Sequence, residues 1–505
     1  MFFNFHIFPH GFALVYLVLN NAPPWCILSF KCMILKSKGG ARSMEHLTPQ
    51  IIADVTGGKF VGDETMRGIR VVGAVRDNRE VKQENLFVCI PGARVDGHSY
   101  AIKAFESGAA CCLAERIIPD ANGPYVLVES TLESIKLIGA HYRSLFSIPV
   151  VGITGSVGKT TAKELVAAAL GAKLNVLKTK ENLNNELGVP LTLLSLSEKH
   201  HAAVIEMGIS DFGEMGRLAE MVRPDIFIMT KIGYAHLKEL GDLNGVLRAK
   251  TEAFAYMNPD GIALLNGDDE LLRGYDPGIR KITFGLGENN DFRAANIRGE
   301  GTSAVSCDIV SKAGSFPVRI PSYGNHLAVL TAAAAAVGSL LGITNDEISR
   351  GLQTFVPVDG RANICATESI TLIDDCYNAN PNSVKAALSS LSELPSRRVA
   401  ILGDMLNLGA QSDELHHDIG VFAAENLVDC LICCGDRSAE IFSGYRSVSG
   451  NPAYHYTNKA DLESALPGLI NSGDTVLVKA SNGMRFEELL PILKGMKNSA
   501  TLGGA

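Results

Sequence analysis

The chain has 505 residues, of which 46% are hydrophobic and 20% are charged, and its formal net charge is −8. This composition excludes an intrinsically disordered chain, which would have fewer apolar residues and a larger net charge. The negative charge also argues against a protein that binds nucleic acid over a broad surface, although it allows a local phosphate site. At roughly 150 residues per domain, the length predicts about three domains.

The first 43 residues differ in composition from the rest of the chain. They contain no Asp or Glu and include the only tryptophan, Trp25. A signal peptide requires basic residues before its apolar run, and this segment has none there. Asparagines and prolines interrupt the run before it is long enough to span a membrane. Met44 opens a segment that is typical of a domain start. We therefore expect translation to start at Met44, so that 1–43 is not translated, and no membrane association for residues 44–505.

Residues 44–148 predict a small α/β domain. Short apolar runs at 71–81, 84–92 and 109–115 are typical of strands, and 101–108 has the spacing of a helix. A second helical pattern at 131–146 leads toward Pro149 and is expected to connect to the next domain.

Residues 149–357 and 358–505 alternate strand and helix patterns, which favours mostly parallel sheets covered on both faces. The sequence therefore predicts an α/β protein of three domains, with a central phosphate-loop domain at 149–357 and smaller domains on either side. The expected strands are 148–154, 201–208, 224–233 and 261–268 in the central domain, and 369–380, 397–405, 427–435 and 473–481 in the last.

A glycine-rich loop follows the apolar run that ends at Thr154 and opens a helix. Glycines let backbone N–H groups turn toward phosphate oxygens, and the start of the helix adds a positive dipole. The strict phosphate-loop motif has glycine where this chain has Ile153, so the loop is a variant, and a turn that binds no nucleotide is the alternative. The predicted ATP contacts are Gly155, Ser156, Val157, Gly158, Lys159, Thr160 and Thr161, with the Thr160 hydroxyl on Mg²⁺.

Two further polar residues follow apolar strands at the expected sheet edge. Glu206 ends AAVIE, and His236 follows the strand at 224–233. Both could serve a Mg²⁺ ion that also binds phosphate oxygens and water, although a capping or core role for His236 is an equal alternative. Lys250 lies on a predicted helix, where a lone lysine is normally solvated.

Polar residues also gather at other strand ends and at the boundary before the last domain. Asn and Asp side chains at such places can bind ribose hydroxyls, substrate amides or phosphate, and Arg361 could reach a phosphate in the cleft. The substrate contacts proposed from these positions are Asn182, Asn185, Tyr377, Asn378, Asn380 and Lys479.

In combination, these motifs resemble the Mur ligase family from about Met44 to about Gly495. The motifs are GITGSVGKTTAKE, ENLNNELGVPLTLL, EMGISDFGEM, YGNHLAVLTAAAA, DDCYNANPNSVKAAL, LGDMLNLG and LVKASNGMRFEE. A glycine three residues before Gly158 is the form of the loop in this family. The resemblance implies a first domain for the uridine nucleotide end of the substrate, a central domain for ATP and a last domain that closes over the ATP.

The resemblance also assigns roles to individual residues. It implies that Lys250 is carbamylated, which turns the amine into a metal-binding carboxylate, and that Thr160, Glu206 and His236 complete the metal sites. Lys159, His236 and Lys250 are the implied catalytic residues. Asn325, Arg361 and Asp375 are implied to contact ATP. Asp77, Arg79, Asp96 and His98 are implied to contact the substrate in the first domain.

The implied activity is an ATP- and Mg²⁺-dependent peptide ligase of peptidoglycan precursor synthesis in the cytoplasm. It would join UDP-N-acetylmuramoyl-tripeptide to D-alanyl-D-alanine through an acyl phosphate, and a monomer is expected. Asn78 and Cys376 stand where the family usually has serine, and Lys238 stands where glutamate is common. Another Mur-type amino-acid ligase and a catalytically silent nucleotide-binding scaffold remain alternatives.

Overall fold

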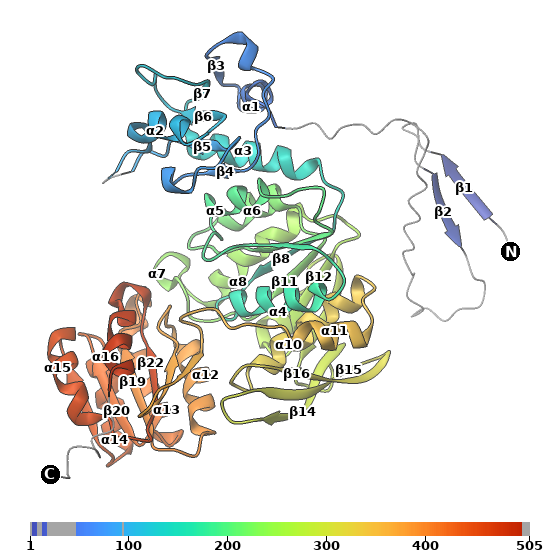
Figure 1. Cartoon of the computed structure of the whole chain (residues 1–505). Helices are drawn as coiled ribbons and strands as arrows, with labels where there is room; N and C mark the ends of the chain where they lie inside the picture. The colour runs from blue at the N-terminus through green and yellow to red at the C-terminus, as the bar shows by residue number, and fades with distance from the viewer. Residues whose placement is uncertain (1–2, 8–12, 18–46, 93–94, 497–505) are drawn as a thin grey trace. The chain divides into compact units, whose positions relative to one another are not determined.

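The computed structural model describes residues 3–7, 13–17, 47–92 and 95–496 (Figure 1). The chain divides into two units, Met1–Arg42 and Ser43–Ala505. In the first unit, strands β1 (Phe3–Ile7) and β2 (Ala13–Leu17) pair antiparallel. Met44, the expected start of translation, lies outside the described residues, so that expectation stays a prediction.

The first sheet of the second unit has five strands in the order β3-β7-β6-β5-β4. Strands β4 to β7 are parallel, and β3 pairs antiparallel with β7. Thr48 and Ser130 begin helices α1 and α3 by accepting a hydrogen bond from a backbone N–H of the first turn. The bounds are β3 (Lys59–Val61), β4 (Ala74–Val75), β5 (Leu86–Val88), β6 (Cys111–Ala114), β7 (Tyr125–Leu127), α1 (Pro49–Thr56), α2 (Ala101–Glu106) and α3 (Thr131–Ser144).

The central sheet has nine strands in the order β16-β15-β14-β13-β12-β11-β8-β10-β9. Strands β8 to β14 are parallel, and β15 and β16 extend the sheet as an antiparallel hairpin. Strands β8, β10 and β11 are buried along their whole length, as expected for continuous apolar runs. The bounds are β8 (Val150–Thr154), β9 (Val176–Lys178), β10 (Ala202–Glu206), β11 (Ile226–Met229), β12 (Ile262–Asn266), β13 (Arg280–Gly285), β14 (Phe292–Gly299), β15 (Val305–Ser311) and β16 (Gly314–Ile320).

Helices cover both faces of the central sheet. On one face, α4, α10 and α11 pack around Val151 and Ile153 of β8. On the other face, residues of α5, α6 and α8 pack with Val150 and Phe227. The bounds are α4 (Lys159–Gly171), α5 (Gly188–Leu193), α6 (Glu214–Val222), α7 (Leu237–Leu240), α8 (Leu243–Thr251), α9 (Glu270–Gly274), α10 (Leu327–Leu340) and α11 (Asn345–Leu352).

The third sheet has six strands in the order β17-β18-β22-β19-β20-β21, and only its edge strand β17 is antiparallel. Asn380 and Ser383 form a reciprocal capping box that begins α12. The bounds are β17 (Asn363–Ala366), β18 (Thr371–Asp374), β19 (Arg398–Gly403), β20 (Cys430–Cys434), β21 (Ala453–Tyr456), β22 (Thr475–Lys479), α12 (Pro381–Ser392), α13 (Ser412–Glu425), α14 (Ser438–Val448), α15 (Lys459–Leu469) and α16 (Leu490–Lys494).

The three sheets use strands within 59–127, 150–320 and 363–479. The predicted α/β class, with a mostly parallel central sheet and smaller α/β parts on either side, is confirmed. The domain boundaries after residues 148 and 357 stay predictions. Among the helices described, none combines the length and the apolar character needed to cross a bilayer.

Close helix packing in the third sheet region leads to the first prediction. A Cβ on Gly420 of α13 would lie 2.0 Å from the Ile441 carbonyl oxygen of α14, so Gly420→Ala must push the two helices apart. We expect a loss of about 2 kcal/mol of stability, measured by urea unfolding. The matched control is Gly468→Ala in α15, where a Cβ meets nothing within 4 Å. That variant should be neutral or slightly stabilised, and equal stability of the two variants would contradict the packing argument.

Candidate active site

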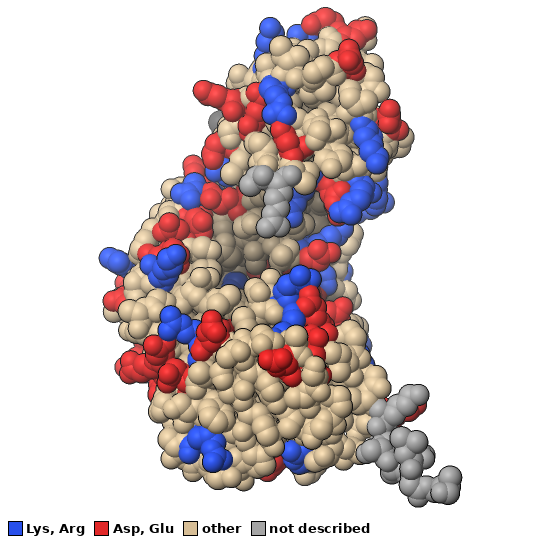
Figure 2. Space-filling model, turned by 90° about the vertical axis from the view of Figure 1, so that its left-hand side faces the viewer, with Lys and Arg blue, Asp and Glu red and all other residues tan. Residues whose placement is uncertain are grey.

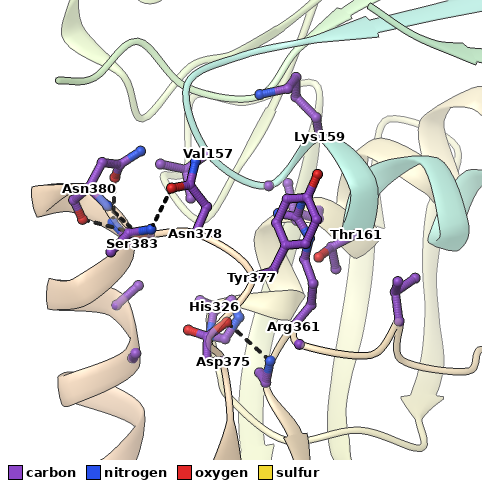
Figure 3. Close-up of a pocket in the computed structure, with 18 of the residues that line it drawn as sticks. Val157, Lys159, Thr161, His326, Arg361, Asp375, Tyr377, Asn378, Asn380 and Ser383 are labelled. Atoms are coloured by element: carbon purple, nitrogen blue, oxygen red, sulfur yellow. Dashed lines mark hydrogen bonds between the residues drawn. The ribbon is translucent and has the colours of Figure 1, made fainter. Parts of the chain in front are cut away.

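A cavity of about 380 Å³ lies where the central and third sheets approach each other. Its walls come from the loop after β8, the start of α10, the connection before β17 and the ends of β18 and β22 (Figure 3). A second cavity of about 250 Å³ shares Ser156, Lys159 and His236 with the first and extends to Lys250. Figure 2 shows acidic and basic side chains interspersed over the visible face rather than one broad basic patch.

The loop after β8 has a backbone course that glycine makes possible. Gly155 has φ +146°, and a Cβ there would lie 2.0 Å from the Thr230 Oγ1 atom. The Thr230 hydroxyl donates a hydrogen bond to the Val157 carbonyl at 2.5 Å. Ser156 Oγ donates to the Gly233 carbonyl at 3.0 Å and accepts from the Gly233 N–H at 2.9 Å. The segment that directly follows β11 therefore holds the loop in place.

Glycine is needed at positions 152 and 158 for different structural reasons. Gly158 has φ +83° and is the N-cap of α4, so that the helix begins directly at Lys159. A Cβ on Gly152 would lie 2.8 Å from the Phe227 side chain, in the interior of the sheet. Gly152 therefore serves the packing of β8 and β11, whereas Gly155 and Gly158 shape the loop.

Lys159 lies between the two cavities. Its Nζ donates a hydrogen bond to the Gly155 carbonyl at 2.8 Å, so the ammonium folds back onto its own loop. Burial lowers the pKa of Lys159, the nearby Glu206 carboxylate partly opposes this shift, and the charge of Arg361 adds to it. An anion at the loop would offset the burial and draw the ammonium away from Gly155.

Two segments contact the buried carboxylate of Glu206 at the end of β10. The Thr160 hydroxyl of α4 donates to Oε1 at 3.2 Å, and the Asn184 side-chain amide donates to the same oxygen at 2.8 Å. Glu206 is 1% exposed, and its Oε2 has no hydrogen-bond partner among the described residues. A buried carboxylate oxygen without a donor, next to a hydroxyl, suits a hard cation such as Mg²⁺.

His236 and Lys250 face the second cavity from α7 and α8. Burial is the main cause that lowers the pKa of His236, and the charges of Lys250 and Lys159 lower it further. Lys250 is 2% exposed, and its side chain makes no hydrogen bond or ion pair with a described residue. Burial lowers the pKa of Lys250 well below that of an ordinary lysine, and Lys159 adds to the effect. Lys250 is therefore buried in the structure, whereas a lone lysine is usually solvated.

No three His, Cys, Asp or Glu side chains in the described part of the chain lie close enough to form a metal site by themselves. A cation beside Glu206 would therefore depend on other oxygens as well. Phosphate oxygens, water and the Thr160 hydroxyl are suitable ligands, because Mg²⁺ binds few protein groups.

The third sheet contributes charged and aromatic side chains to the first cavity (Figure 3). Lys479 is 2% exposed and lies 2.7 Å from Asp375 Oδ2, and Asp375 Oδ1 accepts a hydrogen bond from the Ala362 N–H at 3.2 Å. The Arg361 guanidinium lies 4.1 Å above the Tyr377 ring. These residues form a polar wall that includes an aromatic ring and a guanidinium group, which is suitable for a nucleotide.

Asn380 connects the third sheet to the loop after β8, and its neighbour Asn378 contacts Lys479. Asn380 Nδ2 donates to the Ser156 carbonyl at 3.3 Å while its Oδ1 caps α12. The Asn378 carbonyl accepts from Lys479 Nζ at 2.9 Å. Both asparagines line both cavities.

Among the asparagines of ENLNNELG, the sequence did not single out the one that reaches Glu206. Asn184 makes that contact, whereas Asn182 is exposed and lines neither cavity. Asn185 lines the first cavity, and its Oδ1 caps α5 by accepting from the Gly188 N–H at 2.8 Å. The crowding of polar residues in this segment was the only signal for Asn184.

A similar difference occurs at the start of α10. Asn325 donates to Glu393 at 2.8 Å and lines neither cavity, whereas Ser322, Tyr323 and His326 line the first. The Tyr323 hydroxyl is buried and has no hydrogen-bond partner among the described residues. None of these three residues was predicted from the sequence, although Tyr323 and His326 belong to the motif YGNHLAVLTAAAA.

The four residues predicted in the first domain lie apart from both cavities. Asp77 lies 2.5 Å from Arg79, whose side-chain and backbone hydrogen bonds lower the pKa of Asp77 to about 2. The ring of His98 is buried between Asp96, at 2.7 Å, and the Glu115 N–H, at 2.9 Å. Hydrogen bonds from His98 lower the pKa of Asp96 to about 2. Their role in substrate binding stays a prediction.

The backbone of Gly155 leads to the second prediction. Gly155→Ala would bring its methyl group against Thr230 and force a strained φ, so the loop must change shape. We expect ATP and ADP to bind at least about tenfold more weakly, measured by isothermal titration. Gly171→Ala at the end of α4 meets nothing within 4 Å and serves as the control. Unchanged nucleotide affinity in Gly155→Ala would contradict the assignment of this loop.

Comparisons with known proteins agree on one family. The model of the Mur ligase middle domain matches residues 153–338, and that of the Mur ligase glutamate ligase domain matches residues 360–482. The UDP-N-acetylmuramoyl-tripeptide–D-alanyl-D-alanine ligase of Bacillus subtilis strain 168 is 33% identical over 88% of this chain and 97% of its own length. The ligase of the same name from Escherichia coli K12 is 34% identical over 89% of this chain and 99% of its own length.

Solved structures of the same type share the fold. A crystal structure of MurF from Acinetobacter baumannii has a TM-score of 0.82 and 29% identity, and it covers 90% of this chain and 100% of its own. A MurF ligase from Thermotoga maritima in complex with ADP has a TM-score of 0.74 and 27% identity, over 84% of this chain and 97% of its own. The resemblance inferred from the motifs is confirmed, and the chain belongs to the Mur ligase family.

Proposed function

We propose that this chain joins the terminal carboxylate of UDP-N-acetylmuramoyl-tripeptide to the amine of D-alanyl-D-alanine, with hydrolysis of ATP to ADP and phosphate. The enzyme is an ATP-dependent ligase that forms a C–N bond in peptidoglycan precursor synthesis, as its relatives are. The observation that carries the site assignment is the convergence of Lys159, Glu206, His236 and Lys250 around two adjoining cavities.

In this proposal the first cavity holds ATP. The backbone N–H groups of residues 155–161 would surround the β- and γ-phosphates, and Lys159 would exchange the Gly155 carbonyl for a phosphate oxygen. Arg361, Tyr377 and Asp375 would contact the nucleoside part or its phosphates from the third sheet. This assignment is supported by the position of these residues on the cavity wall. Asp375 is held there 2.7 Å from Lys479, and the Arg361 guanidinium lies 4.1 Å from the centre of the Tyr377 ring.

Mg²⁺ is proposed as the metal, and the residues present fit it. Thr160 and Glu206 would hold one ion beside the phosphates, supported by the donor-free Oε2 of Glu206. His236 and Lys250, the latter as a carbamate, would hold a second. Bound there, Mg²⁺ would neutralise negative charge on the transferring phosphoryl group.

The reaction would proceed in two displacements at the boundary of the cavities. A carboxylate oxygen of the tripeptide attacks the γ-phosphorus of ATP, which forms an acyl phosphate and releases ADP. The neutral amine of D-alanyl-D-alanine then attacks the acyl carbon, phosphate leaves, and the amine loses a proton. Lys159 would stabilise the charge on the phosphoryl oxygens throughout, because it contacts both cavities.

The second cavity is a suitable place for the acceptor dipeptide. It measures about 250 Å³ and is lined by the asparagines Asn378, Asn380, Asn407 and Asn482. Side-chain amides can both donate to a carboxylate and accept from an ammonium group, which a small zwitterion requires. Asn378 and Asn380 line this cavity and are therefore retained as proposed substrate contacts. Tyr377 and Lys479 line the first cavity, and their contact with the substrate stays a prediction, as it does for Asn182, Asn185 and the first-domain residues.

The two alternative functions make different demands on the chain. A catalytically silent scaffold would not require a buried Lys250 that has no ion-pair partner among the described residues and lies near Lys159 and His236. Another Mur-type amino-acid ligase would share the nucleotide site but not the acceptor named for the relatives. A cytoplasmic location and a monomeric state stay predictions, and ATP and UDP-linked precursors are expected in that compartment.

The third prediction tests the activity. With purified protein, ATP, Mg²⁺ and D-alanyl-D-alanine, UDP-N-acetylmuramoyl-tripeptide should gain the mass of D-alanyl-D-alanine less water, and it should gain no mass when single amino acids replace the dipeptide. Lys159→Ala should reduce the rate at least about a hundredfold, because the charge that stabilises the phosphoryl group is lost. An unchanged melting temperature shows that the variant is folded. Addition of a single amino acid, or full activity in Lys159→Ala, would refute the proposal.

The fourth prediction concerns Lys250. Because burial lowers its pKa, a larger share of Lys250 is neutral at a given pH than of an exposed lysine, and the neutral amine is the form that reacts with CO₂. We expect a carbamate signal by ¹³C NMR with labelled bicarbonate. The signal should fade as pH falls and the amine becomes protonated.

Variants separate this modification from a merely structural role of Lys250. Lys250→Ala should lose the NMR signal and at least about a hundredfold in rate, and a short carboxylic acid should restore part of the rate. Lys238→Ala is the control, because Lys238 is an exposed lysine of α7 close in sequence to His236. A Lys250→Ala enzyme with full activity would exclude the carbamate.

A further inference from the structure

Lys163 is a buried charged residue that the proposed reaction does not use. It lies one helical turn after Lys159 on α4 and is 1% exposed. Lysine is almost never fully buried unless it is paired, because removing the ammonium from water is unfavourable. The contacts of Lys163 therefore indicate why the charge is kept inside.

The ammonium of Lys163 is held in one place by three oxygens. Its Nζ donates to the Thr179 carbonyl at 2.8 Å and lies 3.2 Å from Glu164 Oε1. The third oxygen is Glu206 Oε2, at 3.9 Å. The Thr179 hydroxyl also accepts a hydrogen bond from the Glu206 N–H at 2.9 Å, so the same residue fixes the positions of both charges.

Glu206 Oε2 is the oxygen that accepts no hydrogen bond among the described residues. Its Oε1 already accepts from Thr160 and Asn184, which are neutral groups. The positive charge that Oε2 faces most directly is Lys163, since Glu206 and Lys163 are each 1% exposed and water cannot screen the pair. Lys163 is therefore a resident counter-ion of the carboxylate proposed to bind the metal.

Glu164 and Lys178 complete a row of four alternating charges. Lys178 pairs with Glu164 Oε2, and Glu164 Oε1 faces Lys163. The row from Lys178 to Glu206 has no net charge, and only Lys178, which is 47% exposed, reaches solvent to a large extent. Glu164 is already shared between two lysines, so Lys163 cannot be neutralised by it alone.

We propose that Lys163 keeps a divalent cation from binding at Glu206 until the phosphates of a nucleotide bring one. This inference rests on the proposed metal site. Without nucleotide, a cation would enter a site where the charge of Glu206 is balanced by Lys163 and where Lys159 adds a further positive charge. Repulsion between the cation and a fixed ammonium is strong in a buried site.

Nucleotide binding reverses this balance. The β- and γ-phosphates add several negative charges beside Thr160, and they draw Lys159 away from Glu206 toward the phosphate oxygens. The site then has a net negative charge that outweighs Lys163. Metal and nucleotide affinities become coupled, and each raises the other by the same factor.

The test measures Mn²⁺ binding to the full chain without nucleotide, from the electron paramagnetic resonance signal of the free ion. Lys163→Met keeps the length of the side chain and removes the charge, and we expect it to bind Mn²⁺ at least about tenfold more tightly than the wild type. Lys163→Arg keeps the charge and should bind as weakly as the wild type. Lys178→Met is the matched control, because it removes the outer lysine of the row, and it should also resemble the wild type.

A purely structural role for Lys163 gives the opposite result. Loss of its anchor to Thr179 would loosen Glu206, so Lys163→Met would bind Mn²⁺ no more tightly than the wild type, and that result overturns the proposal. If Lys163→Met does not fold, Lys163→Met with Glu164→Gln removes the ion pair as a whole, and the same tighter binding is expected. Weak binding in that double variant also overturns the proposal.

One further variant separates this inference from the metal site itself. Glu206→Gln should weaken Mn²⁺ binding in the presence of ADP. If it does, and Lys163→Met gains no affinity, the metal site stands and the role of Lys163 is refuted. If Glu206→Gln binds Mn²⁺ and ADP as the wild type does, both the metal site and the role of Lys163 are refuted.

Discussion

A carboxylate buried at the end of β10 is the constraint on which the site depends. Glu206 is 1% exposed, and a charge removed from water in this way needs partners from several directions. Those partners come from α4, through Thr160 and Lys163, and from the loop before α5, through Asn184. The start of α4, the end of β10 and the asparagine segment are thereby fixed relative to one another, and the loop after β8 is placed beside them.

The parallel sheet explains why these groups meet. Strands β8, β10 and β11 are neighbours, and their carboxyl ends lie at the same edge of the sheet. The glycine loop, Glu206 and the segment with Thr230 and His236 follow those three strands directly. In the third sheet, β18 and β22 are also neighbours and bring Asp375 and Lys479 to within 2.7 Å. The same topological rule thus builds both walls of the first cavity.

Sequence patterns predicted the parts of the fold and site that depend on local order. The strand at 148–154, the glycine loop and the helix after it follow one another along the chain, so residue type and spacing were sufficient. Residues whose role depends on packing were harder to identify. Lys163 lies four residues after Lys159, and lysines at this spacing are usual on the solvated face of a helix. No neighbouring residue in the sequence indicates that Lys163 is buried. Asn182, Asn184 and Asn185 are equivalent in type, and only contact with Glu206 distinguishes Asn184. The antiparallel hairpin of β15 and β16 was not predicted, because it departs from the βα alternation of the other strands, although Gly314–Ile320 alternates exposed and buried residues.

The contact between Asn380 and Ser156 has a consequence for how the protein unfolds. A single side chain caps α12 and also holds the loop after β8, at 3.3 Å. Other hydrogen bonds across this boundary join the Tyr234 N–H to Asn382 at 3.2 Å, Asn325 to Glu393 at 2.8 Å and His326 to Ser390 at 3.2 Å. The two regions also share one hydrophobic cluster, so without a ligand they are coupled by apolar packing as well as by these hydrogen bonds. A molecule in the first cavity contacts both walls at once, so its binding should raise the stability of both regions together.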